Sequence, residues 1–342
     1  PISSTRGGIK WMQGQKSLLM GAERAEQAVH GGGSVVTQAN YQIEDESAFG
    51  SAAVQAAHLG DEVVFVGRNR NEIRALSFDA TTKNGWVSKA VSFLGEHLVR
   101  SVKELHFARA PDPTIIALLD SGDLVACTYD RGEQVAAWWR LPLGAVVSAA
   151  VVETTSGSEL WCLKPRADGL HAEVIPLHET AVELLDSWST AVVPVGGIVA
   201  GLARFNGLNV RVVLDGAVIG DYPVAGGSMT ITDVEVEGET VTLGLPFTAT
   251  ARLLPRDLKS GKAHSPKIGV LLNDSALPKL NGRRPADRTP ATAMDGGEPR
   301  RSGKFDVANL GWSDEDVITV EQDLPFRTEI LAIYSRTQAN EA

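Results

Sequence analysis

Histidine and cysteine side chains are the groups in this sequence that would first suggest a metal centre. No pair of them has the HExxH spacing or the Cys/His spacing of a zinc site. The stretch GEHL at 95–98 has the glutamate and one histidine of a metal-binding helix but lacks the second histidine. We therefore expect no metal site, and isolated structural histidines at His30, His58, His97, His106, His171, His178 and His264.

Phosphate-binding and nucleophile motifs are also incomplete. The glycines at 31–33 are not followed by GK[ST], and Ser260-Gly261-Lys262 is followed by Ala263, where a P-loop needs a hydroxyl for magnesium. The sequence contains no GxSxG nucleophile elbow. We expect no cofactor and no catalytic residue of these classes.

Acidic residues leave two hypotheses open. Asp120 with Asp123, and the acidic run 314–316, could each hold calcium, but neither has the EF-hand spacing, so turns and solvated charge are favoured. Glycoside hydrolysis needs two carboxylates that face one cleft. Sequence spacing cannot reveal such a pair among 42 acidic residues, so an enzyme remains an alternative.

The elements that would position any of these groups are repeated hairpins. Each is an apolar strand, a polar or glycine turn and a second strand, and successive hairpins start 46, 51, 44 and 50 residues apart. Valine, isoleucine, leucine and tryptophan dominate the strands. A short apolar segment precedes most of them. The five hairpins start at Ser17, Val63, Thr114, Ser158 and Leu208.

Three or four strands in every 44–51 residues are typical of propeller blades. A single blade has two apolar faces that it cannot bury alone, and neighbouring blades cover them. We therefore predict an all-β protein with a β-propeller of five or more blades over residues 1–245. Segments 46–58 and 84–103 are ambiguous, and the second could contain a helix.

The pattern ends near Leu245, and residues 246–342 are predicted to form a smaller β domain. Within it, residues 281–304 have almost no apolar content and are expected to be a long exposed basic loop, or disordered. Strands are expected at 267–274, 316–322 and 327–335.

Charge is distributed unevenly. Residues 252–304 contain 12 Lys/Arg and 5 Asp/Glu, a local charge of +7, whereas the chain carries −10 overall and the remainder −17. This balance argues against a nucleic-acid binder, since phosphate affinity comes mainly from Lys and Arg. The basic loop is either inert or an arm that docks on an acidic neighbour, with direct DNA contact less favoured. Its candidate interface residues are Arg283, Arg284, Arg300 and Arg301.

Trp138 and Trp139 are adjacent on a predicted strand, so their rings should point to opposite faces. Core packing of both is one interpretation, and a subunit contact by one ring is the other. Cys127 and Cys162 are expected to be buried free thiols. No apolar run is long enough to span a membrane as a helix. The chain starts PISSTRGG, without an initiator methionine, and we expect upstream sequence to be missing.

Several segments resemble the tail nozzle proteins of short-tailed bacteriophages, also called tail tubular protein B or phage stabilisation proteins. The resemblance starts with TRGGIKWMQGQKSLLMGAERAEQAV, continues through DEVVFVGRNRNEIRALSFD, EHLVRSVKELHFARAPDPTIIALLDSGDLVACTYDRGEQVAAWWR and SELWCLKP, and ends with GLPFTATARLLP and VITVEQDLPFRTEILAIYSR. It covers nearly the whole chain in colinear order and is weakest in 281–304. No segment of it is a catalytic motif.

The resemblance implies a structural virion protein and no enzyme. It implies a homo-oligomeric ring, typically a hexamer, at the distal end of the phage tail, assembled in the bacterial host cytoplasm. The ring would lie below a portal-proximal adaptor protein, retain packaged DNA and pass it as non-specific cargo. Tail fibres are a further candidate partner. The alternatives are a propeller enzyme acting on host polysaccharide and a propeller scaffold that binds other proteins.

Overall fold

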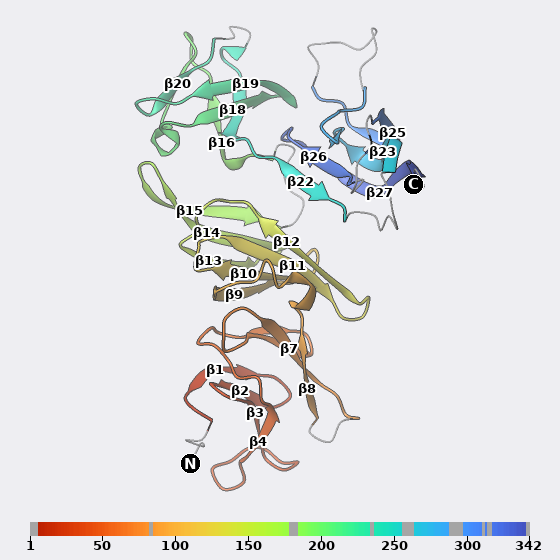
Figure 1. Cartoon of the computed structure of the whole chain (residues 1–342). Coiled ribbons are helices and arrows are strands. Elements are labelled where there is room, and N and C mark those ends of the chain that lie inside the picture. Colours follow the sequence, from red (N-terminus) through yellow and green to blue (C-terminus); the bar gives the residue numbers. More distant parts are fainter. Residues whose placement is uncertain are drawn as a thin grey trace. The chain divides into compact units, whose positions relative to one another are not determined.

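The computed structural model describes residues 6–81, 85–177, 184–232, 236–254, 263–286, 297–309, 312 and 317–339. The chain is all-β, with 57% of its residues in strands and 2% in helices. It divides into two compact units, residues 1–180 and 181–342, and each is described by itself (Figure 1).

The first unit contains four small antiparallel sheets with the same strand connectivity. In each sheet, strands that follow one another in the chain lie side by side (Figure 1, red to yellow-green). The first sheet contains β1 (Ile9–Gly14), β2 (Leu18–Ala22), β3 (Glu26–His30) and β4 (Gln42–Ser47). The second contains β5 (Ala57–Leu59), β6 (Glu62–Val66), β7 (Ile73–Phe78) and β8 (Trp86–Ala90).

The third and fourth sheets continue the series. The third contains β9 (Val102–Ala108), β10 (Thr114–Leu119), β11 (Leu124–Asp130) and β12 (Val135–Leu141). The fourth has only three strands, which are β13 (Ser148–Glu153), β14 (Ser158–Arg166) and β15 (Gly169–Pro176).

Apolar cores lie between consecutive sheets. Trp11 and Leu19 of the first sheet pack against Phe65 of the second. The opposite face of the second sheet packs against the third, around Ile73 and Ile115. The third packs in turn against the fourth, around Ile116 and Leu160. Because the middle strands β6 and β10 are apolar on both faces, as buried strands must be, each can contribute to two cores.

The second unit has a different strand connectivity. Its first sheet has the order β16 (Asp186–Val192), β21 (Thr240–Leu245), β18 (Asn209–Leu214) and β19 (Ala217–Pro223), so strands distant in sequence pair. A two-stranded sheet of β17 (Ile198–Ala200) and β20 (Ser228–Thr230) lies within the intervening chain. Together they enclose a core around Phe205, Val210 and Leu243.

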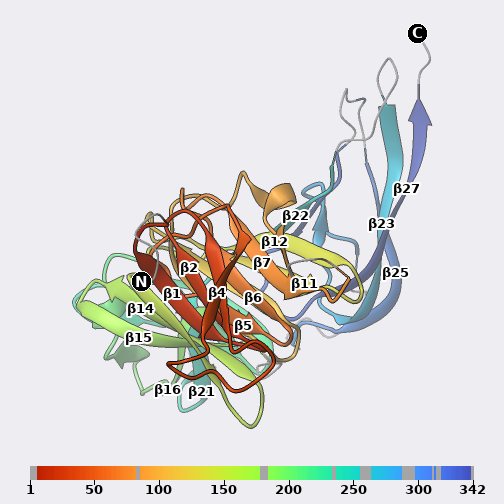
Figure 2. The same ribbon diagram turned by 90° about the horizontal axis from the view of Figure 1, so that it is seen from below.

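Two further sheets complete the second unit. One has the order β22 (Ala249–Arg252), β26 (Thr319–Gln322) and β24 (Lys279–Leu280). In the other, β23 (Ala263–Ser275) lies between β25 (Arg301–Ala308) and β27 (Glu329–Ala339), and Figure 2 shows the long β23 and β27 side by side. Their core contains Ile268, Val270 and Leu280.

The predicted hairpins are all present, and the all-β prediction is confirmed. Closure of the sheets into a propeller of five or more blades stays a prediction. Four of the five hairpins belong to the first unit, whereas the fifth, β18–β19, belongs to the second and pairs with β21. The predicted boundary at 245/246 lies inside the second unit, between β21 and β22, and also stays a prediction.

Two local predictions need correction or completion. Residues 301–304 are not loop, because they begin β25, whose alternating side chains pair with β23. Residues 287–296 of the predicted basic loop lie outside the described residues. The ambiguous stretch 84–103 contains β8, one short 3-10 turn at Phe93–Gly95 and the start of β9.

Candidate functional site

The two adjacent tryptophans lie on β12, the outermost strand of the third sheet, and their rings point to opposite faces as predicted. Trp138 packs against the core between the second and third sheets, and its Nε1 donates a hydrogen bond to the Val91 carbonyl at 3.0 Å. Trp139 is 40% exposed. The rings are therefore not both buried, and a partner contact through Trp139 stays a prediction.

Arg283 and Arg284 make contacts within the second unit. The Arg283 guanidinium donates to the Ala308 carbonyl at 3.2 Å, and Arg284 forms an ion pair with Asp323. Lys279 holds the other Asp323 oxygen at 2.6 Å. Burial raises the Asp323 pKa, but the Lys279 hydrogen bond and the two positive charges outweigh burial and hold that pKa below its usual range.

The other two candidate arginines flank the start of β25. Arg300 forms an ion pair with Asp274 at 3.0 Å, and Arg301 pairs with Ser275 in the β23–β25 register. Intramolecular partners are thus present for three of the candidates, Arg283, Arg284 and Arg300. A protein that bound these arginines would have to share them with those partners. Sequence reasoning missed these partners because they lie 25 to 39 residues away in the chain.

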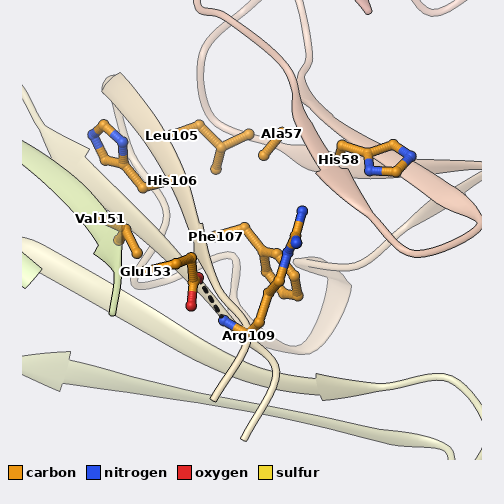
Figure 3. Close-up of a pocket in the computed structure, with 8 residues that line it drawn as sticks. All are labelled: Ala57, His58, Leu105, His106, Phe107, Arg109, Val151 and Glu153. Atoms are coloured by element: carbon orange, nitrogen blue, oxygen red, sulfur yellow. Dashed lines mark hydrogen bonds between the residues drawn. The ribbon is translucent and has the colours of Figure 1, made fainter. Parts of the chain in front are cut away.

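A hollow of about 330 Å³ lies where the first strands of three successive sheets meet (Figure 3). β9 lies beside both β5 and β13 there. Glu104 of β9 strengthens this junction by accepting a hydrogen bond from the Ala149 main-chain nitrogen at 2.9 Å. The lining residues are Ala57, His58, Leu105, His106, Phe107, Arg109, Val151 and Glu153.

The polar groups of the hollow differ in their chemistry. Burial lowers the His106 pKa, against the opposing effect of Glu104, so His106 is neutral at pH 7. Both oxygens of Glu153 accept hydrogen bonds, one from the Arg109 main chain at 3.2 Å and one from Ser158 Oγ at 2.8 Å. The Arg109 side chain lies beside Phe107 in Figure 3. Glu153 is therefore a structural acceptor, and Arg109 carries the positive charge that faces the hollow.

Two buried glutamates in the first sheet were not identified from the sequence. Glu26 is fully buried and accepts hydrogen bonds from Ser47 and from Ser51, and burial raises its pKa. Burial and the charge of Glu44 raise the pKa of Glu46 to about 7. Glu46 follows a polar run on β4, and nothing in that run signals burial.

The acidic pair proposed as a calcium alternative forms a turn. Asp120 pairs with Arg70 at 2.6 Å, and Asp123 accepts a hydrogen bond from Ser121 Oγ at 2.8 Å. The run 314–316 lies outside the described residues. Within the residues that the structure describes, no group of three histidine, cysteine or acidic side chains is placed to hold a metal ion.

Both cysteines are buried free thiols, as predicted, with Cys127 between the second and third sheets and Cys162 between the third and fourth. Burial raises the Cys127 pKa to about 12. None of the helices within the described ranges is long and apolar enough to cross a membrane.

Comparison with known proteins adds no family. No family model matches the sequence, and a comparison with curated proteins finds no match. The resemblance to phage tail nozzle proteins therefore enters only as the basis of a proposal.

Proposed function

We propose that this chain is a structural subunit of the tail nozzle of a short-tailed bacteriophage. In this proposal, copies assemble into a ring, six in number by analogy, at the distal end of the tail. The ring retains packaged DNA and then forms the conduit for its ejection. The subunit is a virion component without catalytic activity, and it is assembled in the host cytoplasm.

The observation that carries the proposal is the colinear resemblance of segments from the start of the chain to its end. The repeated sheets of the first unit support it, since each sheet buries a face against the next and the result is a rigid body suited to assembly. A blade-like interpretation of these four sheets, with more sheets closing a propeller, belongs to the same proposal.

Charge supports a conduit in which DNA is cargo. Outside residues 252–304 the chain carries −17, and an acidic lining would repel the duplex and prevent tight phosphate binding. The partners that the proposal requires are a second copy of the chain, a portal-proximal adaptor protein and, at the periphery, tail fibres.

Electron microscopy and native mass spectrometry of the purified chain test the proposal. We expect rings of one subunit type with a central channel, with contacts of more than ~1,000 Å² between neighbours. A protein that stays monomeric at high micromolar concentration, alone and with the adaptor ring, would contradict it.

The hollow between β5, β9 and β13 favours one alternative, a propeller enzyme whose site lies where first strands converge. In that case the purified chain would release reducing ends from host polysaccharide, and Arg109→Gln would abolish the release. The nozzle proposal predicts no release by either protein.

A further inference from the structure

In the fourth sheet of the first unit, one face is covered by no other sheet of that unit within the described residues. Its other face, with Leu160 and Cys162, packs on the third sheet. The strand register brings Ala150, Trp161 and Val174 into one row of the free face, because directly paired residues share a side. We call this surface the end face. Its residues are Ser148, Ala150, Val152, Glu159, Trp161, Leu163, Pro165, Leu170, Ala172, Val174 and Pro176.

The end face is apolar and exposed. Nine of its eleven residues are apolar, and Trp161 is 41% and Leu170 61% exposed. Its single charge belongs to Glu159, which accepts a hydrogen bond from Trp161 Nε1 at 3.1 Å. Contiguous apolar surface of this kind usually marks an interaction site. Because no lysine or arginine lies on it, nucleic acid is a poor occupant.

The first unit itself shows what covers such faces. Each of its three inter-sheet cores is formed by one sheet packing on the next, and the end face continues that series without a further sheet in the unit. The other end of the series is the far face of the first sheet. There Met12 is 54% and Leu18 41% exposed, whereas Met20 and Val29 on the same side are buried within the chain, so the open apolar part of this face is its β1–β2 edge.

We infer that the end face of one copy binds the far face of the first sheet of a second copy of this chain, at the exposed Met12 and Leu18 side chains. This contact would extend the internal series of sheet-on-sheet cores from one copy to the next. It joins two different surfaces, so it repeats head to tail and generates a ring when the rotation closes. The inference rests on the self-assembly that the proposed function requires, and it names the surfaces involved.

The size of the end face sets the strength of the contact. Its middle strand β14 is nine residues long, and the edge strand β15 is eight residues long. Three strands about 4.8 Å apart, with eight residues rising about 3.3 Å each, give a footprint of roughly 400 Å². The end face and an equal area of its partner bury at most about 800 Å², so other surfaces must supply the rest of the ~1,000 Å² expected between ring neighbours. A single contact is therefore weak, and assembly should depend on concentration.

Sedimentation velocity over a range of concentrations tests the end face. We expect Trp161→Glu and Val174→Lys each to weaken assembly by at least about tenfold, corresponding to ~1.4 kcal/mol. Leu94→Glu is the matched control, because Leu94 is an exposed apolar residue of the same unit outside the end face. Its assembly should equal that of the wild type. Unchanged assembly of both end-face variants would overturn the inference and leave the ring proposal standing.

Cysteine cross-linking tests the head-to-tail pairing. Met12→Cys and Val174→Cys variants are made separately, given different tags and mixed under mild oxidation, while the native cysteines stay silent because they are buried. We expect disulfide dimers that carry both tags. Dimers of Val174→Cys with itself would overturn the head-to-tail pairing. Wild-type monomers that instead bind phosphatidylcholine vesicles through Trp161 would overturn both the inference and the ring.

Discussion

In the first unit every sheet is made from strands that are neighbours in the chain, whereas in the second unit β16 pairs with β21 across an intervening pair of hairpin strands and a small separate sheet. The first unit consequently buries its apolar residues between sheets, in a series of three cores. The second buries many of them around one sheet and the segments that cross it. Pairing between strands that are neighbours in the chain gives a series of similar sheets to which another sheet could be added. Pairing between strands that are distant in the chain gives a unit without such a series.

The largest expected effect distinguishes the two kinds of core. Phe65→Ala removes a fully buried ring that contacts Trp11 across the first two sheets, with centroids 5.6 Å apart. Phe205→Ala removes a fully buried ring in the second unit. Each should cost about 3–5 kcal/mol and, in calorimetry, lower the transition of its own unit only. A single transition that both variants lower equally would remove the contrast between the units.

A smaller effect concerns a polar link between sheets. Glu62 of β6 is buried and accepts hydrogen bonds from the Tyr129 hydroxyl at 2.8 Å and from Arg131 at 3.0 Å, both on or after β11. Glu62→Ala should destabilise the first unit by about 2–4 kcal/mol, because the Tyr129 hydroxyl loses its partner. Urea unfolding measures the loss. Glu133→Ala, at an exposed position, should change stability by less than about 0.5 kcal/mol.

The pH dependence of the first unit should reveal Glu46. Its folded pKa of about 7 lies above the ordinary value of 4.5, so its contribution to stability is fully present below pH 4.5 and is lost as the pH rises through 7. Glu46→Gln removes this loss and should stabilise the first unit at pH 8 by about 1–3 kcal/mol. Thermal unfolding at pH 5 and pH 8 measures it. Equal stability changes at both pH values would contradict the assignment.

The smallest effect is expected in the basic segment. Arg300 pairs with Asp274 at a largely exposed position, and such pairs contribute about 0–1 kcal/mol. Arg300→Gln should therefore leave the melting temperature of the second unit nearly unchanged. A loss comparable to that of Glu62→Ala would show that this ion pair is a structural requirement of β23 and β25.

The sequence predicted what is local. The hairpins β10–β11 and β14–β15 follow from apolar runs broken by turn residues, which are visible within twenty residues of chain. The pairing of β18 with β21 could not be predicted, since no local pattern selects a partner across the chain segment between them. The candidate interface residues show the same contrast between local features, which the sequence predicts, and long-range contacts, which it does not. The opposed rings of Trp138 and Trp139 follow from strand alternation, but the Asp323 partner of Arg284 does not.

The positions of the two thiols have a practical consequence. Cys127 is closed off by the contact of the second sheet with the third, and Cys162 by that of the third with the fourth. A thiol reagent can reach each sulfur only when its own pair of sheets parts, and the raised pKa leaves Cys127 almost wholly protonated until then. The labelling rates of the two native thiols would therefore report the opening of each pair of sheets separately, without any engineered cysteine.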